Sequence, residues 1–177
     1  MLGEIMIDIT TERNKDGFYT IDIGKVANDG IITVNAVIST ASRLTKLNYE
    51  DVAKMLGRKS ETVRKFIHMN NMVTVDEETY VPCYMDNIRL NGNEIERLYF
   101  ILNDNRTEKS CIGLDIFANA EVKTRSDEME INYVNEAYYK YEFLKVVKNL
   151  EPIDIENAIS EDKAQASIDV LLDRIAK

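Results

Sequence analysis

The sequence predicts an α+β fold that is mainly helical, with a β-hairpin at the N-terminus and a helical C-terminal region. Two patterns carry this prediction. Isoleucine residues alternate with polar residues on both sides of the segment 14–17, which is typical of paired β-strands. Apolar residues recur at intervals of three and four along 33–44, 49–68 and 132–149, which is typical of helices with one buried face.

The chain has 177 residues, of which 45% are hydrophobic, and this is enough to bury a core. It contains no run of roughly eighteen apolar residues and no N-terminal basic segment followed by an apolar one. We therefore expect a soluble cytoplasmic protein with no membrane partner. Cys83 and Cys111 follow no metal-binding spacing, so we expect free thiols.

The N-terminal hairpin is predicted by two alternating runs around a turn at Asp16-Gly17. The isoleucines and tyrosine that form these runs are Ile5, Ile7, Ile9, Tyr19, Ile21 and Ile23. A two-stranded hairpin is marginally stable alone, so it must pack on a helix, extend a sheet or pair with a second copy.

A supporting helix is predicted after the break at residues 28–30, with Thr33 as its N-cap. Its apolar face consists of Val34, Val37, Ile38, Ala41 and Leu44. Two further helices follow within 49–68. Ala53 allows them to cross closely, and Gly57 permits the turn between them because it adopts positive φ readily. Ser60 is the predicted N-cap of the second helix.

Two short β-prone runs follow at 72–75 and 79–81, separated by an acidic turn, and Pro82 is predicted to end the second strand. The order of three helices and a hairpin resembles the winged helix-turn-helix superfamily over residues 33–84. Arg58 departs from that pattern, because an apolar residue usually follows the glycine; it either extends toward a phosphate or weakens the turn. The acidic turn would repel phosphate.

The resemblance implies that the second helix lies in the major groove of duplex DNA. The residues predicted to contact DNA are Arg58, Lys59, Ser60, Thr62, Arg64, Lys65 and His68. Between residues 43 and 72 there are seven basic side chains and three acidic ones, whereas the whole chain has a net charge of −9. This asymmetry indicates a basic reading module on an acidic body.

The C-terminal region is predicted to be helical over 91–102, 132–149 and 163–176. The segment 110–122 fits a helix or a short strand, and we prefer the helix. Four tyrosines concentrate aromatic area around the helix at 132–149, either as core or as a partner surface, namely Tyr133, Tyr138, Tyr139 and Tyr141. The division into regions is therefore 1–30 for the N-terminal hairpin, 31–86 for the winged helix-turn-helix, and 87–177 for an acidic region that dimerises or binds a partner.

Catalytic signals are nearly absent. His68 is the only histidine, and the seven glycines form no phosphate-binding loop. We therefore expect no enzyme, no cofactor and no metal site.

Two functions fit these expectations. The first is a small DNA-binding transcription regulator of phage or mobile-element type, with double-stranded DNA as its partner and a homodimer as a further option. The second is an inhibitor whose acidic body binds a basic protein. In size and charge the whole chain is loosely similar to anti-CRISPR proteins, which would make that partner a Cas nuclease.

Overall fold

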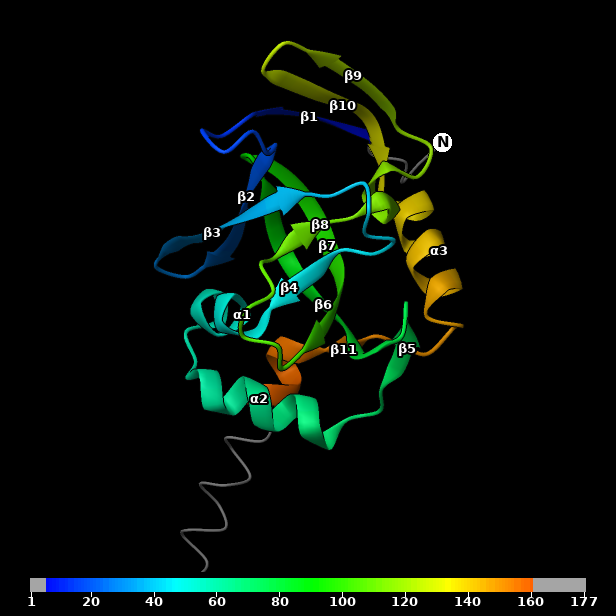
Figure 1. Ribbon diagram of the computed structural model, residues 1–177. Helices are drawn as coiled ribbons and strands as arrows, with labels where there is room; N and C mark the ends of the chain where they lie inside the picture. The colour runs from blue at the N-terminus through cyan, green and yellow to red at the C-terminus, as the bar shows by residue number, and fades with distance from the viewer. Residues whose placement is uncertain (1–5, 161–177) are drawn as a thin grey trace, which may run out of the picture.

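The computed structural model describes residues 6–160, and within them the fold is mainly β (Figure 1). The strands are β1 (Met6–Glu12), β2 (Thr20–Ala27), β3 (Gly30–Ile38), β4 (Lys46–Asn48), β5 (Val73–Val75), β6 (Glu78–Leu90), β7 (Asn93–Asn103), β8 (Cys111–Ile112), β9 (Glu121–Arg125), β10 (Glu128–Asn135) and β11 (Ile153–Asp154). The helices are α1 (Tyr49–Leu56), α2 (Ser60–Met69), α3 (Glu136–Val146) and the 3₁₀ helix η1 (Leu114–Phe117), and residues 155–160 are helical as well. The expected mainly helical α+β class was therefore wrong.

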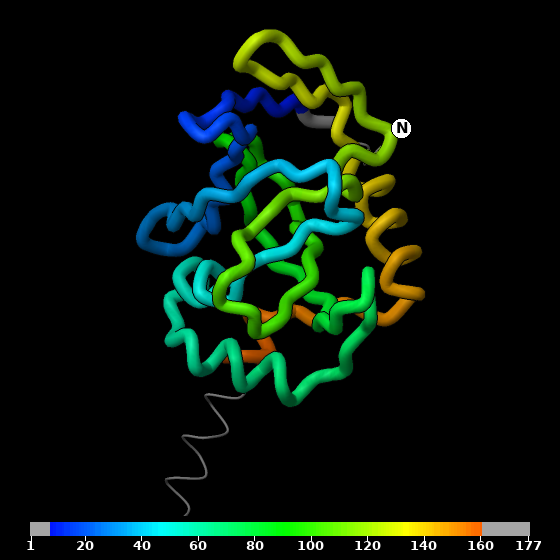
Figure 2. Tube along the Cα trace, in the orientation of Figure 1, coloured from blue at the N-terminus to red at the C-terminus, as the bar shows by residue number. Residues whose placement is uncertain are grey.

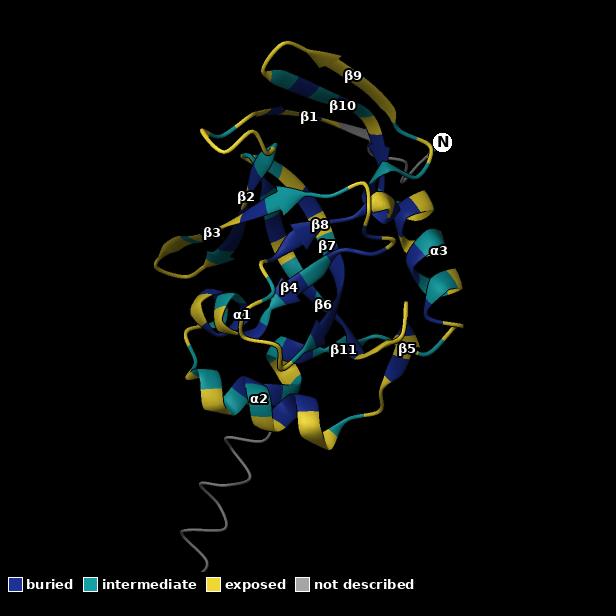
Figure 3. Ribbon diagram, viewed as in Figure 1, coloured by how far each residue is buried: buried dark blue, intermediate teal, exposed yellow. Residues whose placement is uncertain are grey.

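The larger sheet closes on itself. Its strands follow the order β11-β6-β2-β3-β8-β4-β7, and β6 also pairs with β7 at the far end of that order. The result is a closed barrel whose strands contribute many of the buried residues of the core, and Figure 3 colours these strands largely dark for burial. A second sheet, β1-β10-β9, lies at one end of the barrel, and the tube in Figure 2 follows the chain from one sheet to the other.

The segment predicted as the supporting helix is strand β3. It pairs antiparallel with β2 from Thr20 opposite Val37 to Ala27 opposite Gly30. Val34 and Ala36 are buried while Asn35 between them is exposed, so the true period is two residues. The same apolar residues also fit helical spacing, and only the pairing with β2 decides between the two.

Strand β7 was also mistaken for a helix. Residues 98–102 are all buried, because both faces of this part of the strand are covered. Such a strand shows no alternation, and its apolar residues match helical spacing by coincidence. The segment 110–122, for which we preferred a helix, contains β8 and η1 and the start of β9.

The N-terminal hairpin has different partners from those predicted. β1 pairs with β10, and β2 pairs with β3 and β6, while a single bridge between Arg13 and Tyr19 joins the two predicted strands. Turn signals along the chain identify strands, but they do not show which strands become neighbours.

The helices at 49–56 and 60–69 lie where the spacing predicts a helix pair. Gly57 ends α1 with φ of 64°, and the Arg58 N–H donates to the Ala53 carbonyl at 2.9 Å. Lys59 rather than Ser60 occupies the N-cap position of α2, and no side chain caps that helix. The following hairpin, β5 with β6, is present too, but β6 continues through Pro82, which lies opposite Ile101, to Leu90.

Helix α3 covers the middle of the helix predicted for 132–149. Asn135 caps it, and its side chain accepts from the Ala137 and Tyr138 N–H groups at 2.9 and 3.3 Å. The helix expected over 163–176 lies outside the described residues. No helix within residues 6–160 combines the length and the apolar character that crossing a membrane requires.

Candidate functional site

A buried polar cluster lies where β3 and β8 end. These two strands run parallel, with Val37 opposite Cys111 and Ile38 opposite Ile112, so the segments that follow them meet. The Ser39 N–H donates to the Ile112 carbonyl, and the Leu114 N–H donates to the Ser42 carbonyl, both at 2.9 Å. Strand β4 then pairs with β8 from its other side.

Gly113 allows this close approach. A Cβ atom on it would lie 2.4 Å from the Leu44 carbonyl oxygen and 2.9 Å from that of Ser42. Any larger residue would push the turn at 39–45 away from the segment after β8. The glycine is required here by space and not by its φ.

Asp115 is the acid at the centre of the cluster, and only 2% of it is exposed. Its Oδ1 accepts from the Thr45 N–H at 3.1 Å, the Thr45 hydroxyl at 2.9 Å and the Ile116 N–H at 3.0 Å. The Thr45 hydroxyl oxygen accepts in turn from the Gly113 N–H at 3.2 Å. Burial raises the pKa of Asp115 to about 7, because loss of water disfavours the carboxylate more than the bonds from Thr45 favour it.

Helix α3 reaches the same cluster through Tyr139. This side chain is buried and its hydroxyl donates to the Tyr99 carbonyl of β7. Burial raises the pKa of Tyr139 well above its usual value, and the charge of Asp115 acts in the same direction. Tyr139 packs edge-on against Tyr99, which also contacts Phe143, so aromatic contacts hold α3 to the barrel.

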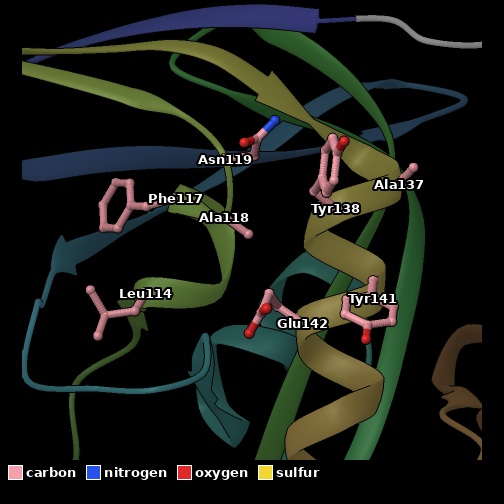
Figure 4. Close-up of a pocket in the computed structure, with 8 residues that line it drawn as sticks. All are labelled: Leu114, Phe117, Ala118, Asn119, Ala137, Tyr138, Tyr141 and Glu142. Carbon is pink, nitrogen blue, oxygen red and sulfur yellow. The ribbon is translucent and has the colours of Figure 1, made fainter.

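An apolar groove of about 800 Å³ lies directly outside the cluster, between η1 and α3 (Figure 4). Figure 4 shows Leu114 and Phe117 on one side and Tyr138, Tyr141 and Glu142 on the helix opposite. The groove is lined by Leu114, Phe117, Ala118, Asn119, Ala137, Tyr138, Tyr141 and Glu142. It can hold apolar or aromatic side chains, since Leu114 and Tyr141 are exposed and Glu142 adds an acid at the rim.

The four tyrosines noted in the sequence divide between the two roles considered for them. Tyr139 is core, whereas Tyr133, Tyr138 and Tyr141 are exposed, and the last two line the groove. Sequence reasoning missed Asp115. Its signal is one acidic residue inside the otherwise apolar run Ile112-Gly113-Leu114-Asp115-Ile116-Phe117, which is typical of a buried, hydrogen-bonded carboxyl group.

The residues predicted to contact DNA are placed along and before α2, and they form few contacts with one another. Lys59, Lys65 and His68 are exposed, while Arg58, Ser60, Thr62 and Arg64 are half-buried. Arg58 donates to the Ser160 hydroxyl at 3.4 Å, and His68 lies 3.0 Å from Asp104. Arg64 lies over the Tyr49 ring and 3.6 Å from Glu61. Whether any of them contacts nucleic acid stays an untested prediction.

Within residues 6–160, no three His, Cys, Asp or Glu side chains cluster in a way that would hold a metal ion. In the same range, no carboxyl group hydrogen-bonds to another carboxyl group. Glu136, whose pKa burial raises, accepts from the Glu96 backbone N–H. The described chain therefore contains isolated acids and no bonded pair.

Neither the family models nor the sequences of curated proteins match this chain. Among solved structures, its fold is similar to the crystal structure of a retropepsin-like aspartic protease from Rickettsia conorii. The TM-score is 0.54 and the sequences are 17% identical, and the match covers 75% of this chain and 96% of the other. At this identity the likeness shows the fold alone.

This finding corrects the predicted function. A retropepsin-like fold does not support a DNA-binding transcription regulator, and the anti-CRISPR inhibitor has no support either. The reason is physical: a helix-turn-helix needs a third helix behind the pair, and in this chain that position is taken by the strands of a barrel. The helix pair connects β4 to β5, and its apolar face packs into the same core as the barrel strands.

Proposed function

We propose that this chain is a retropepsin-like domain that holds an extended polypeptide segment in the groove between η1 and α3 without hydrolysing it. Aspartic proteases activate water with two carboxyl groups that share one proton at about 3 Å. The observation that carries the proposal is the state of Asp115. Its Oδ1 accepts hydrogen bonds from the Thr45 N–H, the Thr45 hydroxyl and the Ile116 N–H. The side chain is buried, so it cannot reach a water molecule in the groove.

Dimerisation would not place Asp115 of one copy beside Asp115 of another to form the pair of carboxyl groups that an aspartic protease needs. Two copies can share a proton only if each presents its acid at the common surface, and Asp115 is 2% exposed. The turn at residues 39–45, which lies beside Asp115, exposes no carboxyl group either. Thr40, Ala41 and Arg43 are its exposed residues, and none of them is an acid.

The groove has the chemistry of a site for apolar side chains of a polypeptide. Tyrosine side chains provide a large contact area and lose little conformational entropy on binding. Glu142 at the rim and a net charge of −9 favour a segment with a Lys or Arg beside its apolar residues. A cytoplasmic location belongs to the same proposal, since Cys83 and Cys111 are both free and buried.

Binding is tested with a library of extended peptides and fluorescence anisotropy. Tyr141→Ala and Leu114→Ser should each weaken the best peptide by roughly tenfold or more, because groove anchors dominate the free energy of binding. Tyr133→Ala is the matched control, since this tyrosine is 54% exposed but does not line the groove. Equal affinity in all four proteins would remove the groove from the proposal.

Peptide hydrolysis is the second candidate, favoured by the likeness of the fold and by the raised pKa of Asp115. It is tested by incubating the protein with a denatured protein substrate from pH 3 to pH 8 and analysing fragments by mass spectrometry. We expect no cleavage above that of an Asp115→Asn variant. Cleavage that this variant loses would establish a protease and overturn the non-catalytic proposal.

A further inference from the structure

A second cavity, of about 250 Å³, lies between the outer face of the barrel, α3 and the chain that returns from α3 to β11 beside β6 (Figure 1). Its floor is formed by Tyr84 of β6 with Arg97 and Tyr99 of β7. Among the described residues, none lines both this cavity and the groove between η1 and α3. The volume is below that of sites for drug-sized ligands, so the cavity fits one group of the size of an amino acid. The wall residues are Lys140, Leu144, Asn149, Glu151 and Pro152.

The register of β6 and β7 places the floor residues on one face. Tyr84 lies opposite Tyr99. Two residues along, Asp86 lies opposite Arg97, so all four side chains are on the same side of the pair. The Arg97 Cζ atom lies 3.8 Å from the centroid of the Tyr84 ring, and the Nε donates to Asp86 Oδ1 at 2.8 Å. These two contacts fix the guanidinium group over the ring before any ligand binds.

Arg97 can still bind an anion from this position. Asp86 engages Nε, and the two terminal nitrogens can form the paired hydrogen bonds with which arginine binds a carboxylate. The bond with Asp86 also raises the pKa of Arg97 above its usual value, so the group is charged although only 36% of the side chain is exposed. Lys140, which is exposed on α3, and the Asn149 amide add donors in the wall.

The acids around the cavity favour a singly charged anion. Glu151 lies in the wall and Asp86 lies beside Arg97. Asp154 is also near, because burial and then its charge raise the pKa of Tyr84. A doubly charged phosphate would be repelled by these three carboxylates more strongly than a carboxylate would. Glu151 can in addition accept a hydrogen bond from an N–H group next to the ligand carboxylate.

The rest of the cavity suits an apolar or aromatic group. The Tyr84 and Tyr99 rings are tilted by 55° with their centroids 6.0 Å apart, and Leu144 and Pro152 are half-buried opposite them in the walls. Tyr99 also packs on Phe143 of α3, with 5.5 Å between the ring centroids. The floor is therefore held by the core, and it offers aromatic contact area beside the guanidinium group.

The wall after α3 has an unusual backbone. Lys148 and Asn149 have φ of 57° and 61°, so two successive residues other than glycine are left-handed. The Asn149 N–H donates to the Leu144 carbonyl at 2.8 Å, which fixes this turn at the end of the helix. Left-handed backbone is costly for residues with a Cβ atom, and such residues concentrate at functional sites. Here they bring Asn149 and Glu151 to the cavity.

We propose that this cavity binds a small carboxylate with an aromatic or apolar side chain, either a free amino acid or the C-terminal residue of a polypeptide. Arg97 and Lys140 hold the carboxylate, and the side chain packs on Tyr84 and Leu144. The site lies apart from the groove between η1 and α3 and does not depend on the function proposed for that groove.

The test is an NMR titration of the full chain, labelled on leucine methyl groups, with four probes: phenylalanine, N-acetyl-phenylalanine, N-acetyl-phenylalaninamide and inorganic phosphate. The first two carry a carboxylate and should bind with a dissociation constant of about 1 mM or below. They should shift the methyl signals of Leu144 more than those of Leu114. The amide and phosphate should bind roughly tenfold more weakly or worse. Tighter binding of phenylalanine identifies a free amino acid as the ligand, and tighter binding of the acetylated form identifies a chain end.

Three results would overturn the proposal: no binding of either carboxylate, equal binding of the amide or phosphate, or shifts confined to Leu114. The last result would place the probe in the groove, so the failure of this proposal is distinct from the failure of the groove as a binding site.

Variants assign the carboxylate to its partners. Arg97→Gln removes the charge and the paired donors, so it should weaken N-acetyl-phenylalanine roughly tenfold or more. Arg97→Lys restores the charge without the paired donors and should recover only part of the affinity. Lys140→Gln changes an exposed residue and should weaken binding roughly two- to fivefold. Lys145→Gln is the matched control, since this lysine is exposed on the same helix and does not line the cavity. Unchanged affinity in the Arg97→Gln and Lys140→Gln proteins would contradict the site.

Discussion

Asp115 is held by two opposing effects, burial that favours the acid form and three donors that favour the carboxylate. Burial is the larger effect, and the second oxygen of the side chain has no partner among the described residues. Ionising Asp115 in the folded chain therefore lowers the free energy of unfolding, because the buried carboxylate is less stable there than in water.

This gives a prediction with a definite sign. The pKa of Asp115 is about 7 in the folded chain and about 4 in the unfolded chain, so the folded state keeps a proton that the unfolded state has lost between these values. The contribution of Asp115 to the free energy of unfolding should fall as pH rises from 4 to 7, by on the order of 4 kcal/mol in total. Asp115→Asn should remove that fall.

The measurement is urea unfolding of both proteins at pH 4.5, 6 and 8. Other titrating groups are common to both, so the difference between the two curves isolates Asp115. A difference that does not change with pH would show that the acid is ionised at both ends of the range.

At the scale of elements, α3 is the part that connects the core to the groove. Its N-cap, Asn135, is buried, its inner residue Tyr139 bonds to β7, and its outer residues Tyr138 and Tyr141 line the groove. The position of the groove wall therefore depends on how firmly the helix begins and packs.

Asn135→Ala should lower the free energy of unfolding by about 1 kcal/mol, because the N–H groups of Ala137 and Tyr138 lose their acceptor. Asn135→Ser keeps an acceptor and should lose less. Urea unfolding measures the stability. Helical content from circular dichroism shows whether the loss comes from fraying of α3, and an Ala variant as stable as the Ser variant would contradict the role of the cap.

Some elements were predictable because their signals are local. Gly57 between two apolar stripes identified the α1–α2 pair, and the polar residues 76–77 between β-prone runs identified the β5–β6 hairpin. The helix around α3 was predictable for the same reason. In each case the residues that determine the element lie within one turn of it in the sequence.

At the scale of the whole molecule, the fold was not predictable because distant pairings decide it. Val34 and Ala36 fit a helix until β2 lies beside them, and the apolar run 98–102 fits a helix until β6 and β4 enclose it. The site depends on the same pairings. Thr45 and Asp115 are seventy residues apart, and they meet only because β8 lies between β3 and β4.

The closure of the barrel by β6 and β7 also bears on how the molecule unfolds. Every strand on the closed path has a neighbour on each side, so none can detach without breaking hydrogen bonds along both of its edges. The barrel therefore has no free end from which strands can separate one at a time, and its weakest joint is β8, which pairs with β4 through a single residue pair and with β3 through two. The smaller sheet lies outside that ring. Ile9, Met129 and Ile131 of the smaller sheet nevertheless belong to the same core as the barrel strands, so apolar burial rather than strand pairing holds the two sheets together.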